Sequence, residues 1–135
     1  MKTNRIKLVA AGLISVVCLW SGPVAFAHCD TLDGPVVTAA KTALEKKDIA
    51  PVLKWVKTEY EPELKTAFAR TLVVREQGKE ARELADQFFF ETLVRVHRAG
   101  EGAPYTGLMP AGTKVDPAVG AADQALVSGK ADALI

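Results

Sequence analysis

The sequence predicts an all-α protein, a small helical bundle with a partial internal repeat. Apolar residues in most segments recur three and four positions apart, the spacing that places them on one face of a helix. Proline or an acidic residue stands near the start of several of these segments, where both favour a helix N-terminus. A proline-initiated helical segment near residue 35 is repeated near residue 117. These three features together favour helices in almost every segment of the mature chain.

Residues 1–27 have the three parts of a cleaved secretory signal: a basic start, an uncharged apolar run, and small residues at positions −3 and −1. The apolar run is shorter than the roughly 20 residues of a membrane-spanning helix, although an uncleaved anchor is the alternative. We expect cleavage after Ala27, a periplasmic or secreted mature protein, and no membrane attachment after cleavage. The three parts are Lys2, Arg5 and Lys7, then residues 8–20, then Ala25 with Ala27.

The mature chain, residues 28–135, has the size of one modest domain. Three of the 17 Lys and Arg residues lie in the signal, which leaves 14 basic against 16 acidic residues and a net charge of about −2. This balance gives no reason to expect a nucleic-acid partner. The mature chain has one serine, Ser128, which argues against a serine-hydrolase triad. Covalent-haem, zinc-protease, P-loop and dinucleotide motifs are absent.

Four helices are expected in residues 28–99. Proline in a first turn, an aspartate N-cap, or acidic residues near the positive end of the helix dipole mark three of the starts. Glycine, the preferred residue at a helix C-terminus, marks the end of the fourth and longest helix. In chain order, the marking residues are Pro35, then Asp48 and Pro51, then Glu61 and Glu63, then Lys79 and Gly100 for the limits of the fourth helix.

The fourth helix carries an apolar stripe, which we expect to face inward, and a phenylalanine triplet, Phe88–Phe90. The triplet widens the apolar surface, as in a core shared by several helices; a partner interface is the alternative. Glu91 and Arg95 are spaced as an i, i+4 ion pair on a solvated face. The stripe consists of Ala81, Leu84, Ala85 and Phe88.

Residues 100–115 contain four glycines and two prolines and are expected to form a loop, either functional or a plain connector. Beyond it, residues 117–126 match residues 35–44 at six of ten positions. We interpret residues 116–135 as the start of a second repeat that is truncated in this chain. A truncated repeat leaves an apolar face uncovered, which predicts a homodimer or an unstable chain.

Cleavage after Ala27 would leave His28 and Cys29 at the N-terminus. The α-amine and imidazole of His28 and the thiolate of Cys29 are donors that suit nickel, copper or zinc. Since Cys18 leaves with the signal, Cys29 cannot form an intramolecular disulfide in the mature chain. Its thiol is therefore a metal ligand, capped, or paired between chains.

His97 is the second histidine, and Glu101 follows it by one helical turn. It is either a buried histidine bonded to a backbone carbonyl or a metal ligand or acid/base group that joins His28 and Cys29. The second interpretation requires the N-terminal segment to fold back over the end of the long helix. The other candidates for a pocket there are Asp30, Asp33, Arg98, Glu101 and Tyr105.

Residues 28–34 resemble the metal hook of nickel superoxide dismutase, a helical-bundle enzyme whose processed N-terminus reads His-Cys-x-x-Pro-Cys-Gly. His28, Cys29 and Gly34 match that hook, whereas Leu32 replaces its proline and Asp33 replaces its second cysteine. A carboxylate stabilises nickel(III) poorly compared with a thiolate. The resemblance therefore implies metal capture and gives no evidence of dismutase activity.

A longer resemblance covers most of the mature chain. The chain is similar to an uncharacterised family of exported bacterial helical proteins, the domain of unknown function numbered 6448. This resemblance implies a helical fold, a continuation of the family beyond residue 135, and no assigned activity. The segments that carry it are HCDT (28–31), DGPVV (33–37), EARELAD (80–86) and FFETLVRVHRAGEGAPYTG (89–107).

Three functions remain open at this point, and the sequence does not decide whether the protein is an enzyme. The first is an exported binding protein with a metal hook at its N-terminus. The second is a metal-dependent oxidoreductase that uses the same hook with His97. The third is a non-catalytic structural or interaction module that dimerises through Cys29 or the Phe88–Phe90 surface. No small-molecule partner is identified.

Overall fold

The computed structural model describes residues 28–129, which form an all-α bundle as the sequence predicts. Within these residues no β-strand forms, and an isolated parallel bridge joins Thr31 to Met109. No helix in the same range is long and apolar enough to cross a membrane. The predicted signal lies outside the described residues. The elements are η1 (His28–Asp30), α1 (Pro35–Lys46), α2 (Ala50–Leu53), η2 (Thr58–Tyr60), α3 (Glu61–Val74), η3 (Arg75–Gln77), α4 (Lys79–Glu101) and α5 (Pro117–Ser128).

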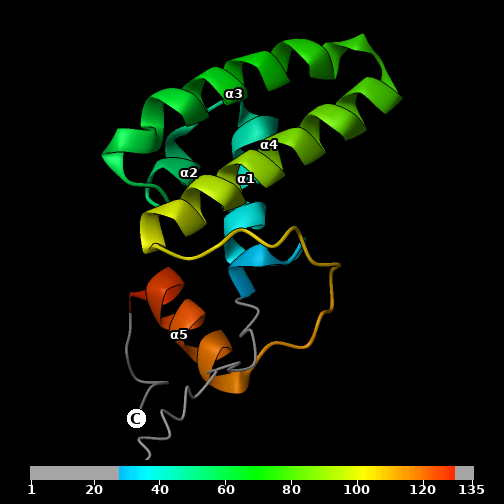
Figure 1. The fold of residues 1–135 in the computed structure, drawn as a ribbon. Coiled ribbons are helices and arrows are strands. Elements are labelled where there is room, and N and C mark those ends of the chain that lie inside the picture. Colours follow the sequence, from blue (N-terminus) through cyan, green and yellow to red (C-terminus); the bar gives the residue numbers. More distant parts are fainter. Residues whose placement is uncertain (1–27, 130–135) are drawn as a thin grey trace, which may run out of the picture.

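Helices α3 and α4 lie side by side as an antiparallel hairpin, and α1 packs against α4 (Figure 1). Helix α5 lies at the opposite end of the molecule from this hairpin and contacts η1 (Figure 1). The core is therefore built mainly by α1, α3 and α4, with α2 packed on α1. Its largest fully buried apolar side chains are Phe89, Leu44, Leu64, Leu93, Val36, Val37, Val52, Val94 and Val96.

The buried face of α4 differs from the predicted stripe. Phe89 and Phe90 are buried, which agrees with a core role for the phenylalanine triplet. The prediction that Leu84 and Phe88 face inward is wrong, because they are 71% and 48% exposed. No other element within residues 28–129 therefore covers the face of α4 on which Leu84 and Phe88 lie.

The C-terminus of α4 lies two residues later than predicted. Gly102, and not Gly100, adopts the left-handed conformation of the helix cap, with φ 70°. Its amide donates to the carbonyls of Ala99 and Arg98, which satisfies the last turn. The Gly/Pro-rich loop therefore begins after Glu101.

Helices α1 and α5 agree in form with the proposed repeat. Each has 12 residues, begins at a proline and ends at a residue with positive φ, 53° at Lys47 and 69° at Gly129. The Asp116 carboxylate caps α5 by accepting a bond from the Ala118 amide. The segment that would correspond to α2 falls in residues 130–135, outside the described part of the chain.

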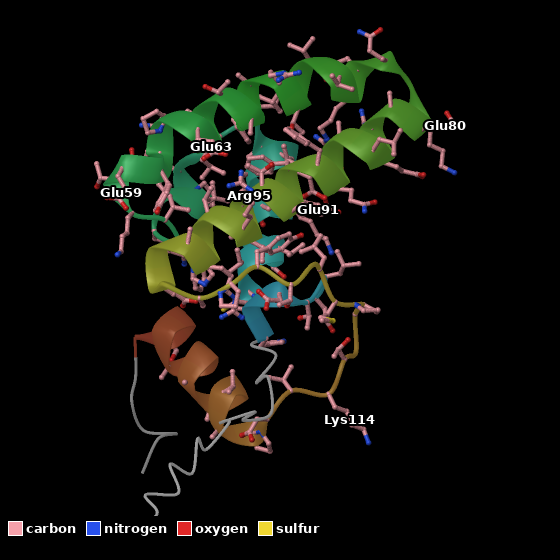
Figure 2. The ribbon with its side chains drawn as sticks, in the orientation of Figure 1. Glu59, Glu63, Glu80, Glu91, Arg95 and Lys114 are labelled. Atoms are coloured by element: carbon pink, nitrogen blue, oxygen red, sulfur yellow. The ribbon has the colours of Figure 1, made fainter. Side chains whose placement is uncertain are left out.

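The predicted Glu91–Arg95 pair does not form. Arg95 instead reaches across the hairpin to the carboxylate of Glu63 on α3 (Figure 2). Glu91 accepts a hydrogen bond from the Gln87 side-chain amide. The sequence spacing allowed the local pair, but antiparallel packing of α3 and α4 brings Glu63 within reach of the same guanidinium. This pair ties the two helices together at the end of the hairpin that is remote from η3.

Candidate functional site

An ion pair fastens the N-terminal turn to the end of α4. The Arg98 guanidinium donates from Nε to Asp30 Oδ1 over 2.8 Å and from Nη2 to Asp30 Oδ2 over 2.7 Å. Both side chains are almost buried, at 12% and 5% exposure. The bonds to Asp30 raise the pKa of Arg98, against the opposing effect of desolvation. A two-point contact of this kind fixes the position and the orientation of the turn.

The turn itself is tightly closed. The amide and the hydroxyl of Thr31 both donate to the carbonyl oxygen of His28, over 3.2 and 2.9 Å. The Gly34 amide donates to the Thr31 carbonyl over 2.9 Å. A Cβ atom on Gly34 would lie 1.9 Å from the His28 oxygen, so only glycine fits at this position. The Asp-Gly-Pro start signal therefore also closes the N-terminal turn.

Alanine at Gly34 and alanine at Gly100 are expected to change stability in opposite directions. Gly34→Ala forces the backbone of the turn apart and should lower the free energy of unfolding by about 1–3 kcal/mol, as overpacking does. Gly100→Ala lies inside α4, where its Cβ meets only the flexible Lys57 side chain at 3.5 Å. It should raise stability by about 0.5–1 kcal/mol. Urea unfolding measures both, and equal effects would contradict this account of the turn.

The loop after α4 packs along the same turn. Met109 donates its amide to the Asp30 carbonyl over 2.8 Å and accepts a bond from the Leu32 amide over 3.0 Å. The Gly112 amide donates to the exposed Asp33 carboxylate over 2.8 Å. This bond, with smaller contributions from Thr31 and the nearby His28, lowers the pKa of Asp33. The loop is therefore held to the N-terminal segment at three points.

A cavity of about 460 Å³ opens where the loop, the turn and α4 meet. Its apolar wall comes from Leu32, Phe90 and Leu108–Pro110, and Glu83 and Asp86 stand at the polar side. The cavity belongs in size to the range of small-molecule sites, about 300–1,000 Å³. The cavity has no signal in the sequence, because its residues come from distant segments. Asp30 and Arg98, in contrast, are among the candidates that the sequence places in one pocket.

His97 occupies the position of a structural histidine. Its Nδ1 lies 2.7 Å from the Trp55 carbonyl oxygen, and its ring meets the Trp55 ring edge-on at 5.8 Å. Its Nε2 faces the Glu101 carboxylate at 3.4 Å, and Glu101 also bonds Arg98 over 3.2 Å. A chain of polar contacts thus leads from His97 through Glu101 and Arg98 to Asp30.

The remaining candidates lie around this chain. Cys29 is 4% exposed and belongs to the apolar core, so its thiol does not lie at the surface where it could link two chains. Tyr105 is partly buried; desolvation first, and then the charges of Glu91 and Asp30, raise its pKa. The fold-back thus brings Asp30, Arg98, Glu101 and Tyr105 together. Within residues 28–129, no group of three or more His, Cys, Asp and Glu side chains is arranged to hold a metal ion.

The fold and this site define a small all-α bundle whose N-terminal turn is clamped to its longest helix. The chain belongs to the family of unknown function DUF6448, whose model matches residues 33–135. Residues 28–32, which include Cys29 and Asp30, precede the part of the chain that the family model matches. No curated protein and no solved structure matches the chain.

Proposed function

We propose that this protein is exported and captures a transition metal ion through its processed N-terminus. The observation that carries the proposal is how firmly Asp30 is held, an arrangement that we call the clamp. The Arg98 guanidinium binds the Asp30 carboxylate, and the Met109 amide donates to the Asp30 backbone carbonyl. The two residues before Asp30 therefore belong to the folded domain and are not a loose tail. Because the backbone of these two residues is already ordered, less conformational entropy is lost when their donors bind a metal ion.

The donors are the α-amine and imidazole of His28 and the thiolate of Cys29, which suit nickel, copper or zinc. The side chains of the described residues do not supply three such donors at one place. The amine that cleavage after Ala27 would release brings the number to three. The site would thus be completed only after export.

Metal binding requires the Cys29 thiol to turn out of the core. Exposing a larger apolar side chain costs about 1.5–3 kcal/mol, which is an upper bound for cysteine. Structural zinc sites with four ligands contribute about 10–16 kcal/mol. A three-donor site needs only a fraction of that energy to offset the exposure of one thiol.

We propose binding without catalysis, because the His97 ring is buried and held in place by a backbone carbonyl. The Trp55 carbonyl takes Nδ1, and Nε2 faces Glu101. Within residues 28–129, Nε2 has no hydrogen bond and could bind a metal without loss of the Nδ1 contact, but it is buried beside Glu101, so an oxidoreductase that uses it would require that carboxylate to move. Binding alone needs no change at His97.

The test uses the chain expressed with its own N-terminal segment in a bacterial host. The purified protein is analysed for intact mass and for bound nickel, copper and zinc. We expect a mass that begins at His28 and close to one metal ion per chain. His28→Ala and Cys29→Ser should each lower the metal content at least tenfold, since each removes a direct ligand.

The matched control is the same mature chain produced in the cytoplasm with a methionine before His28. It keeps both side chains and displaces the α-amine, so it should bind metal much more weakly. A mature wild-type protein with no more metal than His28→Ala would disprove the metal site. A mass that includes residues 1–27 would disprove the processing on which the site depends.

A further inference from the structure

One end of the α3–α4 hairpin carries an uncovered apolar surface. Four large apolar residues that are exposed lie there: Val73 at 67%, Val74 at 43%, Leu84 at 71% and Phe88 at 48%. A cavity of about 240 Å³ lies between the helices at this point, and Val74, Leu84 and Phe88 line it. Four large apolar side chains gathered at one end of a hairpin are typical of a contact surface and not of scattered exposure.

The surface continues along the hairpin as a groove. A second cavity of about 460 Å³ shares Arg70 and Phe88 with the first and extends to Glu63 and Arg95. We call the continuous surface formed by these two cavities the hairpin groove. Figure 2 shows its direction, with Glu80 at the tip of the hairpin and the Glu63–Arg95 pair toward the other end.

Two opposite charges flank the apolar part of the hairpin groove. Arg70 lies at the level of Phe88, and Glu80 lies one helical turn beyond Leu84, toward the tip. In the described range, neither side chain has an ion pair or a hydrogen bond, whereas Glu63 and Arg95 are paired with each other. Along α4, Glu80 and Phe88 are each about 6 Å from Leu84, because four residues of helix rise by that length.

We infer that the hairpin groove binds a second copy of this chain about a two-fold axis that passes through the layer of Val74 and Leu84. Such an axis places the Leu84 side chains of the two copies against each other. It also brings the Arg70 layer of each copy to the level of Glu80 in the other, since the two layers are equally distant from the axis. The two free charges then form two identical ion pairs at the rim of an apolar centre.

The charges determine where along the hairpin the two-fold axis lies. An axis through the Arg70–Phe88 layer would place two Arg70 guanidinium groups together, and like charges across an interface are unfavourable. An axis through the Glu63–Arg95 layer would leave Leu84 and both valines exposed. Only the axis at Val74 and Leu84 covers the apolar residues and matches opposite charges.

The test measures the dimer dissociation constant of the mature chain by sedimentation equilibrium. Leu84→Asp should abolish the dimer. Arg70→Glu and Glu80→Arg should each weaken it by about tenfold, because each reversal creates two like-charge contacts. The chain that carries both reversals should return to within about threefold of wild type, since it restores opposite charges in each pair.

Lys65→Glu is the matched control, since it reverses an exposed charge on α3 that does not line the hairpin groove. It should leave the dissociation constant unchanged, and circular dichroism should show the same helix content for all variants. Cys29→Ser should also leave the dimer intact, which separates this inference from the metal site. A wild-type monomer at the highest soluble concentration, or a double reversal no stronger than the single ones, would overturn the inference.

Discussion

Replacing Arg98 by alanine is expected to lower the free energy of unfolding by about 3–5 kcal/mol. The substitution leaves the Asp30 carboxylate nearly buried, at 5% exposure, without the guanidinium that now holds it. An uncompensated buried charge costs about this much. The loss is a large fraction of the about 5–15 kcal/mol by which a domain is stable. Urea unfolding of the mature chain measures the change.

Arg95→Ala is the matched control on the same helix. Its guanidinium pairs with Glu63 at the surface, with side chains 45% and 49% exposed, and such pairs contribute about 0–1 kcal/mol. The double variant Asp30→Leu with Arg98→Met should recover part of the loss, since it removes both charges. If Arg98→Ala and Arg95→Ala were equally mild, the clamp would not hold the turn.

The prediction of the helices rests on local signals, and those signals were mostly sufficient. Pro35, Glu61 and Lys79 are the first residues of α1, α3 and α4. Helix periodicity, first-turn prolines and acidic first turns depend on residues close in the chain. Gly100 failed as a cap because either glycine of Gly-Glu-Gly can take a positive φ, and tertiary contacts decide which one does.

Leu84 and Phe88 show where periodicity stops being informative. A stripe indicates that a face is apolar, but it does not name the element that covers it. In α4 the buried face is set by α1 and α3, which pack against Phe89, Phe90 and Leu93. The second apolar face, at Leu84 and Phe88, has the same pattern and no covering element in residues 28–129.

The sequence names Asp30 and Arg98 as candidates for one pocket, but it does not predict their ion pair, because the two residues are 68 positions apart. Arg98 also lies three residues before Glu101, a spacing that allows a local ion pair on the helix. Both contacts form, but only the Asp30 contact is two-pointed and buried. The N-terminal fold-back that the site requires thus depends on tertiary structure.

The phenylalanine triplet offers the second large effect. Phe89→Ala is expected to lower the free energy of unfolding by about 3–5 kcal/mol, the cost of a cavity left by a buried phenylalanine. Phe89 is fully buried and its ring lies 5.3 Å from that of Phe68, at a tilt of 56°. The substitution removes both the apolar burial and this contact between α4 and α3. Thermal and urea unfolding should agree on the loss.

Phe88→Ala, one position earlier, separates the core from the hairpin groove. Phe88 is 48% exposed, so the change should cost the isolated chain about 1 kcal/mol or less at low protein concentration. Because its ring lines both cavities of the hairpin groove, the same change should weaken the dimer. Phe89→Ala should instead cause a large loss of stability of the folded chain, and this loss should be the same at every protein concentration. If the two substitutions had the same effect on unfolding of the monomer, the assignment of the two faces of α4 would be wrong.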